Sequence, residues 1–193
     1  MKIGFDFDKI FVNYPVFLPE TLVNFLYKNH NSKLSYRIPG RLEQRIRIFT
    51  HNPTFRQPIK KNMQVLENLA SDPNQELYLI SGRFGFLKQT TENWINKYSI
   101  HSLFKELHFN FENEQPHLEK DRIIKKIGIQ KFVDDDIDLL TYLAKKNPRV
   151  EFYWLDKKNK HLSLPTNITP IKDLVEFQSK YLDQKTKPVI PVS

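Results

Sequence analysis

Two carboxylates one residue apart stand at the end of the first apolar stretch of the chain. Residues 2–12 predict a short strand that ends at Asp6 and Asp8. Because successive strand side chains alternate faces, residues two apart leave the strand on one side. In an open α/β sheet the carboxyl ends of the strands border the crevice where ligands bind. Buried acids need a positive partner, and a hard cation such as Mg²⁺ prefers oxygen ligands. A plain turn or helix cap is the alternative interpretation of this pair.

Two later apolar stretches are also followed by residues that could take part in chemistry. Residues 76–80 predict a buried strand that ends at Ser81 and Gly82, and residues 130–133 predict another. The second of these is followed by four acids, Asp134, Asp135, Asp136 and Asp138. Parallel strands place such ends along one edge of the sheet, so the groups are expected to converge. Lys120, at the start of the helix expected before the acidic strand, supplies a cation within reach of that edge.

The elements that must position these groups follow from hydrophobic periodicity. Helices are predicted over residues 20–30, 41–49, 58–70 (with Pro58 in the first turn), 86–98, 118–127, 139–145 and 171–182, and further strands over 107–111 and 150–155. Strands that alternate with helices from residue 76 onward indicate an α/β protein with a mostly parallel sheet. Residues 14–72 show no convincing central strand. We therefore expect a core made of residues 1–13 and 73–184, a helical insertion over 14–72 and a loose tail over 185–193.

The length and composition of the chain limit the classes of protein to which it can belong. The 193 residues are enough for one domain with a real core, and the absence of cysteine excludes disulfides, thiolate metal sites and cysteine nucleophiles. No apolar run reaches the length that spans a bilayer, and no signal-peptide pattern opens the chain, so we expect a cytoplasmic protein without a membrane partner. A net charge of +8 favours anionic partners. The cations concentrate between residues 33 and 61, where a solvated basic face is the alternative interpretation.

Taken in order, these motifs resemble those of the haloacid dehalogenase-like phosphohydrolases. The resemblance rests on Ile3-Gly4-Phe5-Asp6-Phe7-Asp8, on Leu77-Tyr78-Leu79-Ile80-Ser81, on Lys120, and on Phe132-Val133-Asp134-Asp135. It covers residues 1–13 and 76–160, and the insertion sits where the family places a small helical cap. The resemblance implies a three-layer, Rossmann-like, mostly parallel sheet. It also implies a Mg²⁺-dependent phosphatase.

The resemblance further implies roles for individual residues. Asp6 would attack the phosphoryl group and form an aspartyl-phosphate, while Asp8 would protonate the leaving oxygen and later activate water. Ser81, Gly82 and Lys120 would bind the phosphate or offset its charge. The metal would bind Asp6, the backbone carbonyl of Asp8 and one acid of the last motif, with Asp135 preferred and Asp134 the alternative. Asp136 and Asp138 leave that last choice ambiguous.

The sequence departs from the family pattern beside the second acid and leaves the substrate open. The family often has Gly and then Thr or Val there, whereas this chain has Lys9 and Ile10. Residues 50–83 look like the small-capped 5'-nucleotidases of the superfamily. Substrate contacts are predicted for aromatic and basic residues of this region: stacking on a base for Tyr36, Phe49 and Phe55, and phosphate binding for Arg41, Arg45 and Arg56. The alternative is that the aromatic residues form the insertion's own core.

Three functions remain open at this point. A phosphatase for a small phosphorylated metabolite, with a nucleotide as the specific candidate, accounts for most of the motifs. A polynucleotide-end phosphatase or nucleic-acid-binding protein would explain the basic insertion differently. A catalytically silent relative is the third, because of Lys9.

Overall fold

The computed structural model describes residues 1–14, 34, 36–156 and 162–185. The helix expected over residues 20–30 and nearly all of the expected tail lie outside this part of the chain. The strands are β1 (Lys2–Phe5), β2 (Glu76–Ser81), β3 (Glu106–Phe109), β4 (Lys131–Asp134), β5 (Glu151–Leu155) and β6 (Ile168–Ile171). The helices are α2 (Arg41–Thr50), α3 (Lys60–Ala70), α4 (Lys88–Tyr98), α5 (Pro116–Ile127), α6 (Ile137–Lys146) and α7 (Leu174–Lys185), with short 3₁₀ turns η1 (Gly85–Leu87) and η2 (Ile100–Leu103).

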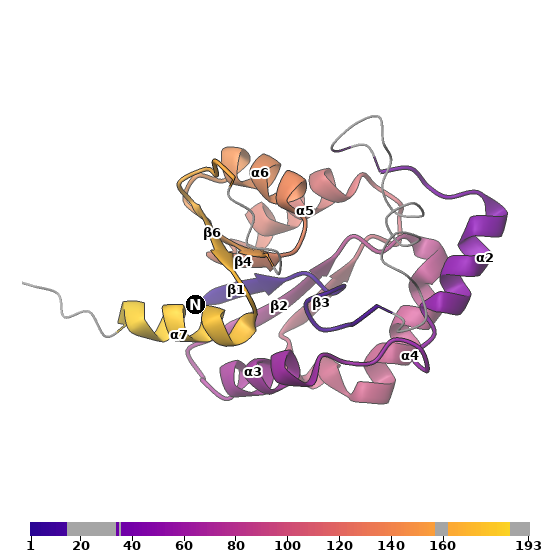
Figure 1. The fold of residues 1–193 in the computed structure, drawn as a ribbon, viewed down its shortest axis with the longest axis horizontal. Coiled ribbons are helices and arrows are strands. Elements are labelled where there is room, and N and C mark those ends of the chain that lie inside the picture. Colours follow the sequence, from indigo (N-terminus) through magenta and orange to yellow (C-terminus); the bar gives the residue numbers. More distant parts are fainter. Residues whose placement is uncertain (15–33, 35, 157–161, 186–193) are drawn as a thin grey trace, which may run out of the picture.

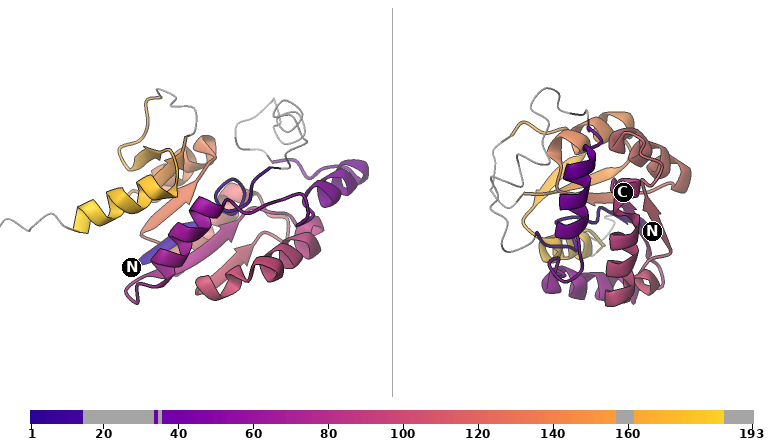
Figure 2. Two further views of the ribbon diagram at one scale, coloured as in Figure 1. Left: turned by 60° about the horizontal axis from the view of Figure 1, so that its bottom comes forward. Right: turned by 90° about the vertical axis from the view of Figure 1, so that its right-hand side faces the viewer.

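The six strands form one parallel sheet in the order β3-β2-β1-β4-β5-β6. Helices cover both faces: α3, α4 and α7 lie on one side and α5 and α6 on the other (Figures 1 and 2). The α/β class and the three-layer, Rossmann-like parallel sheet predicted from the sequence are therefore confirmed. The chain order reverses between β1 and β4, which makes the carboxyl ends of these two strands the place where an open parallel sheet binds ligands.

Strand side chains alternate between two hydrophobic clusters, one under each helical layer. Ile3 and Phe5 of β1 enter the cluster shared with α3, α4 and α7. The opposite face of β4 carries Phe132 into the cluster of α5 and α6. Gly4 permits this packing, because a Cβ built there would lie 2.7 Å from the Phe132 ring. The same alternation turns Asp6 toward the face that α5 covers.

Three local predictions are wrong, each for a physical reason. The polar stretch before the last helix contains β6, whose two buried residues, Ile168 and Ile171, flank a half-buried and an exposed residue, so the period-two alternation that reveals a strand is lacking. Because β6 includes Ile171, the last helix begins at Leu174. Pro58 precedes α3 and bridges Val12, so it ties the insertion to the β1 loop instead of starting the helix.

Elements of the expected insertion occupy two different environments. In α3, Val65, Leu66 and Leu69 are buried in the same cluster as β1. In α2, by contrast, Thr50 is the buried residue, and the helix packs beside η1 at the end of the molecule (Figure 1). The boundaries of core and insertion remain a prediction. None of the helices in the described part of the chain combines the length and apolar character that crossing a bilayer requires.

Candidate active site

The loop that follows β1 is folded back on itself and tied to the rest of the molecule. The Asp6 amide continues the sheet by donating to the carbonyl of Val133 at 2.9 Å, which places Asp6 beside the end of β4. Phe7 then accepts hydrogen bonds from the amides of Phe11 and Val12. The side chain of Asn62 on α3 donates to the carbonyl of Ile10 at 2.6 Å. The carboxylates of this loop are thus held by backbone structure.

Lys120 bridges the carboxylates at the ends of β1 and β4. Its Nζ lies 2.7 Å from Oδ1 of Asp6 and 2.6 Å from Oδ2 of Asp134. All three residues are buried, with Lys120 only 3% exposed. Two buried acids beside one buried ammonium need further positive charge or a proton to be neutral. The sequence prediction that places Lys120 at this edge agrees with this geometry, although α5 begins at Pro116, so Lys120 lies in its second turn.

Three acids of the site converge closely enough to share one cation. One carboxylate oxygen from each of Asp6, Asp134 and Asp135 lies within 4.8 Å of the others. Asp136 has a different task, because its side chain accepts the amides of Asp138 and Leu139 and caps α6. Asp138 is exposed. Among the acids of the last motif, the structure thus gathers Asp134 and Asp135, whereas Asp136 caps α6 and Asp138 lies exposed in its first turn.

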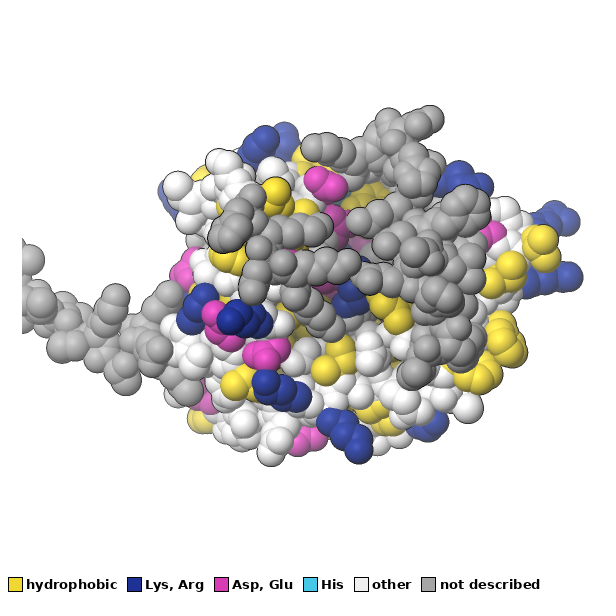
Figure 3. All heavy atoms as spheres, viewed as in Figure 1, with side chains coloured by type: hydrophobic (Ala, Val, Ile, Leu, Met, Phe, Trp, Pro, Cys, Tyr) yellow, Lys and Arg dark blue, Asp and Glu magenta, His cyan; other side chains and the backbone are white. Residues whose placement is uncertain are grey.

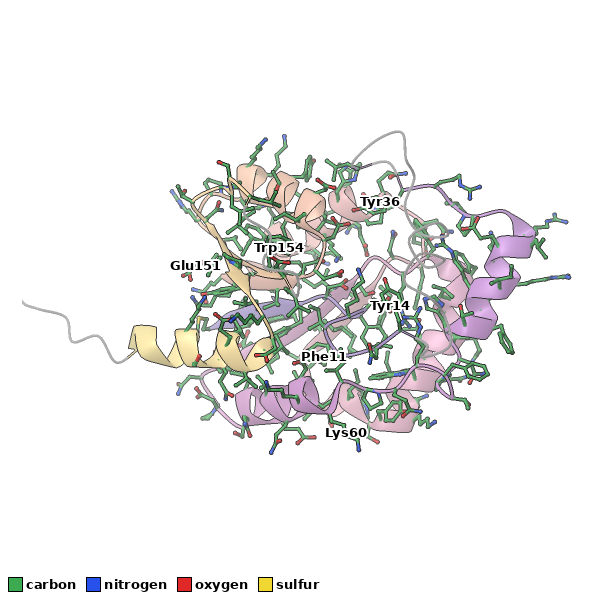
Figure 4. All side chains as sticks on the ribbon, viewed as in Figure 1. Phe11, Tyr14, Tyr36, Lys60, Glu151 and Trp154 are labelled. Atoms are coloured by element: carbon green, nitrogen blue, oxygen red, sulfur yellow. The ribbon has the colours of Figure 1, made fainter. Side chains whose placement is uncertain are left out.

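Lys9 forms an ion pair with Asp135. Its backbone has φ 60°, a left-handed conformation that costs other residues more than glycine. A glycine would adopt this conformation with less strain than Lys9 does. Tyr14, whose ring lies beyond the carboxyl end of β1, faces the Lys9 ammonium at 5.4 Å from the ring centroid (Figure 4). The lysine therefore adds a cation directly at the acidic cluster.

Two arginines that the sequence analysis did not assign to catalysis hold Asp8. Arg83 contacts both carboxylate oxygens, Nε to Oδ2 at 2.7 Å and Nη2 to Oδ1 at 2.8 Å. Nη1 of Arg56 reaches Oδ1 at 3.2 Å. Burial alone would raise the pKa of Asp8, but these guanidinium groups outweigh it and hold that pKa well below its ordinary value.

Both arginines are themselves fixed by buried groups. Arg83 donates from Nη1 to the Thr91 hydroxyl on α4 at 3.0 Å and lies over the Phe7 ring at 4.4 Å from its centroid. Nη2 of Arg56 contacts Nε2 of His51 at 2.9 Å, and burial together with the two guanidiniums lowers the pKa of His51 far below its ordinary value. Arg56 was predicted to meet substrate phosphate, but it is only 1% exposed and its guanidinium contacts the Thr50 carbonyl and Asp8. One sequence feature could have placed Arg83 near the site, namely its position directly after Ser81 and Gly82.

Ser81 and Gly82 end the strand next to β1. Leu79 pairs with Phe5, so Ser81 is level with the loop that carries Asp6 and Asp8. Ser81 is buried at 1% exposure. A Cβ on Gly82 would lie 3.0 Å from Cβ of Pro116 in the first turn of α5, so a glycine allows α5 to approach. Both residues lie at the same edge of the sheet as Asp6 and Asp8, and their binding of phosphate stays a prediction.

The remaining predicted contacts lie further out. Arg41 and Arg45 are exposed on α2, and the ring of half-buried Phe55 lies 5.0 Å from that of Phe49. Tyr36 does not present a free ring edge to a base, since its hydroxyl donates to Asp136 at 2.9 Å and its ring lies beside His117. Figure 4 places Tyr36 on the α5 and α6 side, away from α2. Tyr36 therefore lies apart from the pair formed by Phe49 and Phe55.

Burial and crowding shift the proton affinities of the acidic cluster. Burial raises the pKa of Asp6 to about 8 despite the nearby Lys120 ammonium, with Asp134 and Asp8 adding repulsion. Burial likewise raises the pKa of Asp135 to about 6, although Lys9 opposes the shift. A divalent cation among these oxygens would favour their ionised form. Hard carboxylate oxygens at this spacing suit Mg²⁺.

Solved structures share this fold at low sequence identity. A HAD-superfamily hydrolase of subfamily IA from Geobacter sulfurreducens is 13% identical with a TM-score of 0.59, the match covering 93% of this chain and 95% of that one. A haloacid dehalogenase-like hydrolase from Streptococcus pneumoniae is 10% identical with a TM-score of 0.55, covering 93% and 97%. An archaeal β-phosphoglucomutase from a Pyrococcus species is 12% identical with a TM-score of 0.54, covering 82% and 87%.

The parallel sheet and these likenesses show that the chain has the haloacid dehalogenase-like fold. No protein-family model and no curated protein matches the sequence. The resemblance that the motifs indicated is thus confirmed at the level of the fold. The 5'-nucleotidase branch and the roles of individual residues remain predictions.

Proposed function

We propose that the protein is a phosphomonoester hydrolase that uses Asp6 as its nucleophile and Mg²⁺ as its cofactor. The observation that carries the proposal is the convergence of Asp6, Asp134 and Asp135 within 4.8 Å, with Lys120 between the ends of β1 and β4. These groups come from segments far apart in the chain and meet at the strand edge where parallel sheets bind ligands. The substrate proposed is a small phosphorylated metabolite, with a nucleotide as the specific candidate.

The nucleophile is available for attack. Lys120 engages Oδ1 of Asp6, and Oδ2 has no hydrogen-bond partner among the described residues. In the proposed first step an Asp6 oxygen forms a bond to phosphorus, the ester P–O bond breaks, and the leaving alkoxide takes a proton. Water then cleaves the acyl phosphate and returns Asp6 to a carboxylate.

The charges at the site support an anionic substrate together with a cation. Four carboxylates (Asp6, Asp8, Asp134 and Asp135) face four cations (Lys9, Arg56, Arg83 and Lys120) through the ion pairs of the site. The formal charge of these eight side chains is therefore zero, and it stays zero when a phosphate dianion and Mg²⁺ bind together, because their charges cancel. Asp6, Asp134 and Asp135 would hold the metal with the Asp8 carbonyl, and the metal would neutralise charge on the phosphoryl oxygens.

Asp8 is the proposed acid and base. Its contacts with Arg83 and Arg56 favour the carboxylate, which is the form that accepts a proton from water in the second step. Protonation of the leaving group in the first step requires that these contacts loosen. A phosphate beside the Arg83 guanidinium competes with Asp8 for it, and this competition would free Asp8 to carry a proton.

The test is phosphate release from nucleotides, sugar phosphates and p-nitrophenyl phosphate, with and without Mg²⁺. We expect Mg²⁺-dependent turnover that Asp6→Asn abolishes while circular dichroism shows an intact fold. Asp138→Asn is the matched control, because Asp138 is an exposed acid of the last motif and lies outside the cluster. Full activity in Asp6→Asn would remove Asp6 as nucleophile. No turnover in the wild-type protein on any substrate would favour the catalytically silent alternative.

A further inference from the structure

One face of α2 presents apolar and cationic side chains together. Leu42 is 74% exposed, Ile46 41% and Phe49 60%, although residues of this kind are normally buried. Arg41 and Arg45 are exposed on the same side of the helix, four residues apart. We call Arg41, Leu42, Arg45, Ile46 and Phe49 the α2 surface. Figure 3 shows dark blue and yellow side chains gathered at this end of the molecule.

The acid of α2 does not neutralise the cations of the α2 surface. Glu43, the acid of α2, is occupied by Arg37 at 2.6 Å and by Arg47 at 2.7 Å. Arg41 and Arg45 have no ion pair among the described residues. These two guanidiniums lie one helical turn apart, about 6 Å between their Cβ atoms, and are spaced to meet successive anionic groups.

An aromatic platform continues the α2 surface. The Phe49 and Phe55 rings lie 5.0 Å apart at an interplanar angle of 49°. Phe49 is mostly exposed and Phe55 is half-buried. Accessible aromatic side chains beside cations are the combination on which nucleic-acid bases stack while phosphates meet Arg or Lys. An anionic membrane would also meet cations and apolar groups, but it would make no use of the contacts by which Arg56 connects α2 to Asp8.

The α2 surface is joined to the proposed catalytic site by one side chain. Nε of Arg56 donates to the carbonyl of Thr50, the last residue of α2, at 3.2 Å, and its Nη1 donates to Asp8. α2 also packs beside η1, which follows Ser81, Gly82 and Arg83 along the chain. Arg56 thus links the last residue of α2 directly to Asp8.

We propose that the α2 surface binds single-stranded nucleic acid whose terminal phosphate enters the site at Asp6. The inference rests on the proposed phosphomonoesterase function and gives its substrate class: a polynucleotide end, recognised by its backbone charge and by base stacking. Such contacts are independent of base sequence, since every base has a stacking face and every nucleotide a phosphate.

Two measurements test this inference on the full chain. The first is the ratio of kcat/KM for a short oligonucleotide with a terminal phosphate to kcat/KM for p-nitrophenyl phosphate. We expect Phe49→Ala to lower this ratio roughly fivefold to a hundredfold, the range for loss of one stacked base. Phe49→Trp should keep the ratio, whereas Phe49→Leu should lose it although the side chain stays apolar. Because Phe49 is mostly exposed, these variants are expected to fold.

The second measurement is the salt dependence of oligonucleotide binding to Asp6→Asn protein. The double variant Arg41→Gln with Arg45→Gln should flatten the plot of log affinity against log salt by about 1.4, or about 0.7 per lost phosphate contact. The control is Lys145→Gln with Arg149→Gln, two exposed cations near the end of α6, which should leave the slope unchanged. An unchanged slope in the α2 variant would overturn the inference.

The outcomes separate the inference from the function on which it rests. Mg²⁺-dependent hydrolysis of p-nitrophenyl phosphate without any preference for oligonucleotides overturns the inference and leaves the phosphatase in place. Oligonucleotide binding that depends on Phe49, without hydrolysis by the wild-type protein, overturns the phosphatase. Binding to vesicles of anionic lipid that depends on Phe49, together with oligonucleotide binding that does not, overturns the nucleic-acid assignment.

Discussion

Arg83 binds the Asp8 carboxylate in a bidentate fork, with Nε 2.7 Å from one carboxylate oxygen and Nη2 2.8 Å from the other. The arginine is 5% exposed and is anchored at its third nitrogen by Thr91. A fork of this kind fixes the plane of the carboxylate as well as its charge. In the proposed reaction Asp8 must point at the leaving oxygen, so Arg83 is a positioning residue for it.

The first prediction concerns that fork. Arg83→Lys keeps the charge but replaces a planar fork with a point charge, so we expect kcat to fall about 10–100-fold, the range for groups that orient a catalytic side chain. Arg83→Ala leaves Asp8 without its main partner and should lower the free energy of unfolding by about 3–5 kcal/mol. Steady-state kinetics and urea denaturation measure the two effects.

The control for this prediction is Arg122→Lys on α5. Arg122 has a side chain 58% exposed and pairs with Glu114 at the surface, so the change should alter the free energy of unfolding by no more than about 0.5 kcal/mol. Equal kcat values for wild type and Arg83→Lys would show that the fork does not position Asp8 for catalysis.

The sequence predicts where the acids of the site lie, because each of them follows an apolar stretch that is recognisable as a strand. Asp6 and Asp134 each end an apolar strand, and parallel strands bring such ends together whatever the loops between them do. The same reasoning could not find the partners of Asp8, since Arg56 lies 48 residues away and Arg83 lies 75 away. Their approach depends on how the β1 loop folds back, which no periodicity encodes.

The fold shows the same division between local and long-range information. Helices with a clear apolar face, such as α5 and α6, were predicted within a few residues of their ends. β6 was missed because an edge strand of four residues with a proline carries too little alternation to be recognised. Its place is decided by pairing with β5, where Phe152 lies opposite Ile168.

The second prediction concerns the ammonium between β1 and β4. Lys120→Met leaves Asp6 and Asp134 buried without their shared cation, so we expect the free energy of unfolding to fall by about 3–5 kcal/mol without metal. Because Mg²⁺ binds the folded form, it should restore stability more in this variant than in the wild type. Thermal unfolding with and without Mg²⁺ measures the difference. Lys125→Met, an exposed lysine on the same helix, is the control and should respond to Mg²⁺ as the wild type does.

The third prediction concerns Lys9, a cation at a backbone position that favours glycine. Lys9→Gly removes the ion pair with Asp135 and suits the left-handed backbone at φ 60°. Lys9→Met removes the same charge but keeps a Cβ. Both should bind Mg²⁺ more tightly than the wild type, because Asp135 loses a competing partner.

The two Lys9 variants should differ from each other in stability. Lys9→Gly is expected to be more stable than Lys9→Met by about 1 kcal/mol, since only glycine adopts this conformation without strain. Calorimetric titration with Mg²⁺ and urea denaturation separate the two effects. Weaker Mg²⁺ binding by both variants would mean that Lys9 supports the metal site.

The last prediction concerns Glu119, a buried acid outside the proposed chemistry. It is 4% exposed, and its Oε2 has no hydrogen-bond partner among the described residues. Burial raises its pKa from 4.5 to about 7, while Lys120 and Arg122 oppose the shift. Between these pH values the folded protein holds a proton that the unfolded chain releases, so the free energy of unfolding falls as pH rises through this window.

Glu119→Gln should remove that fall, so its free energy of unfolding should match that of the wild type near pH 4 and exceed it at pH 8 by up to about 3 kcal/mol. Urea denaturation across the range measures this, with the exposed Glu112→Gln as control. Parallel stability curves for wild type and Glu119→Gln would show that Glu119 is already ionised at neutral pH in the folded protein.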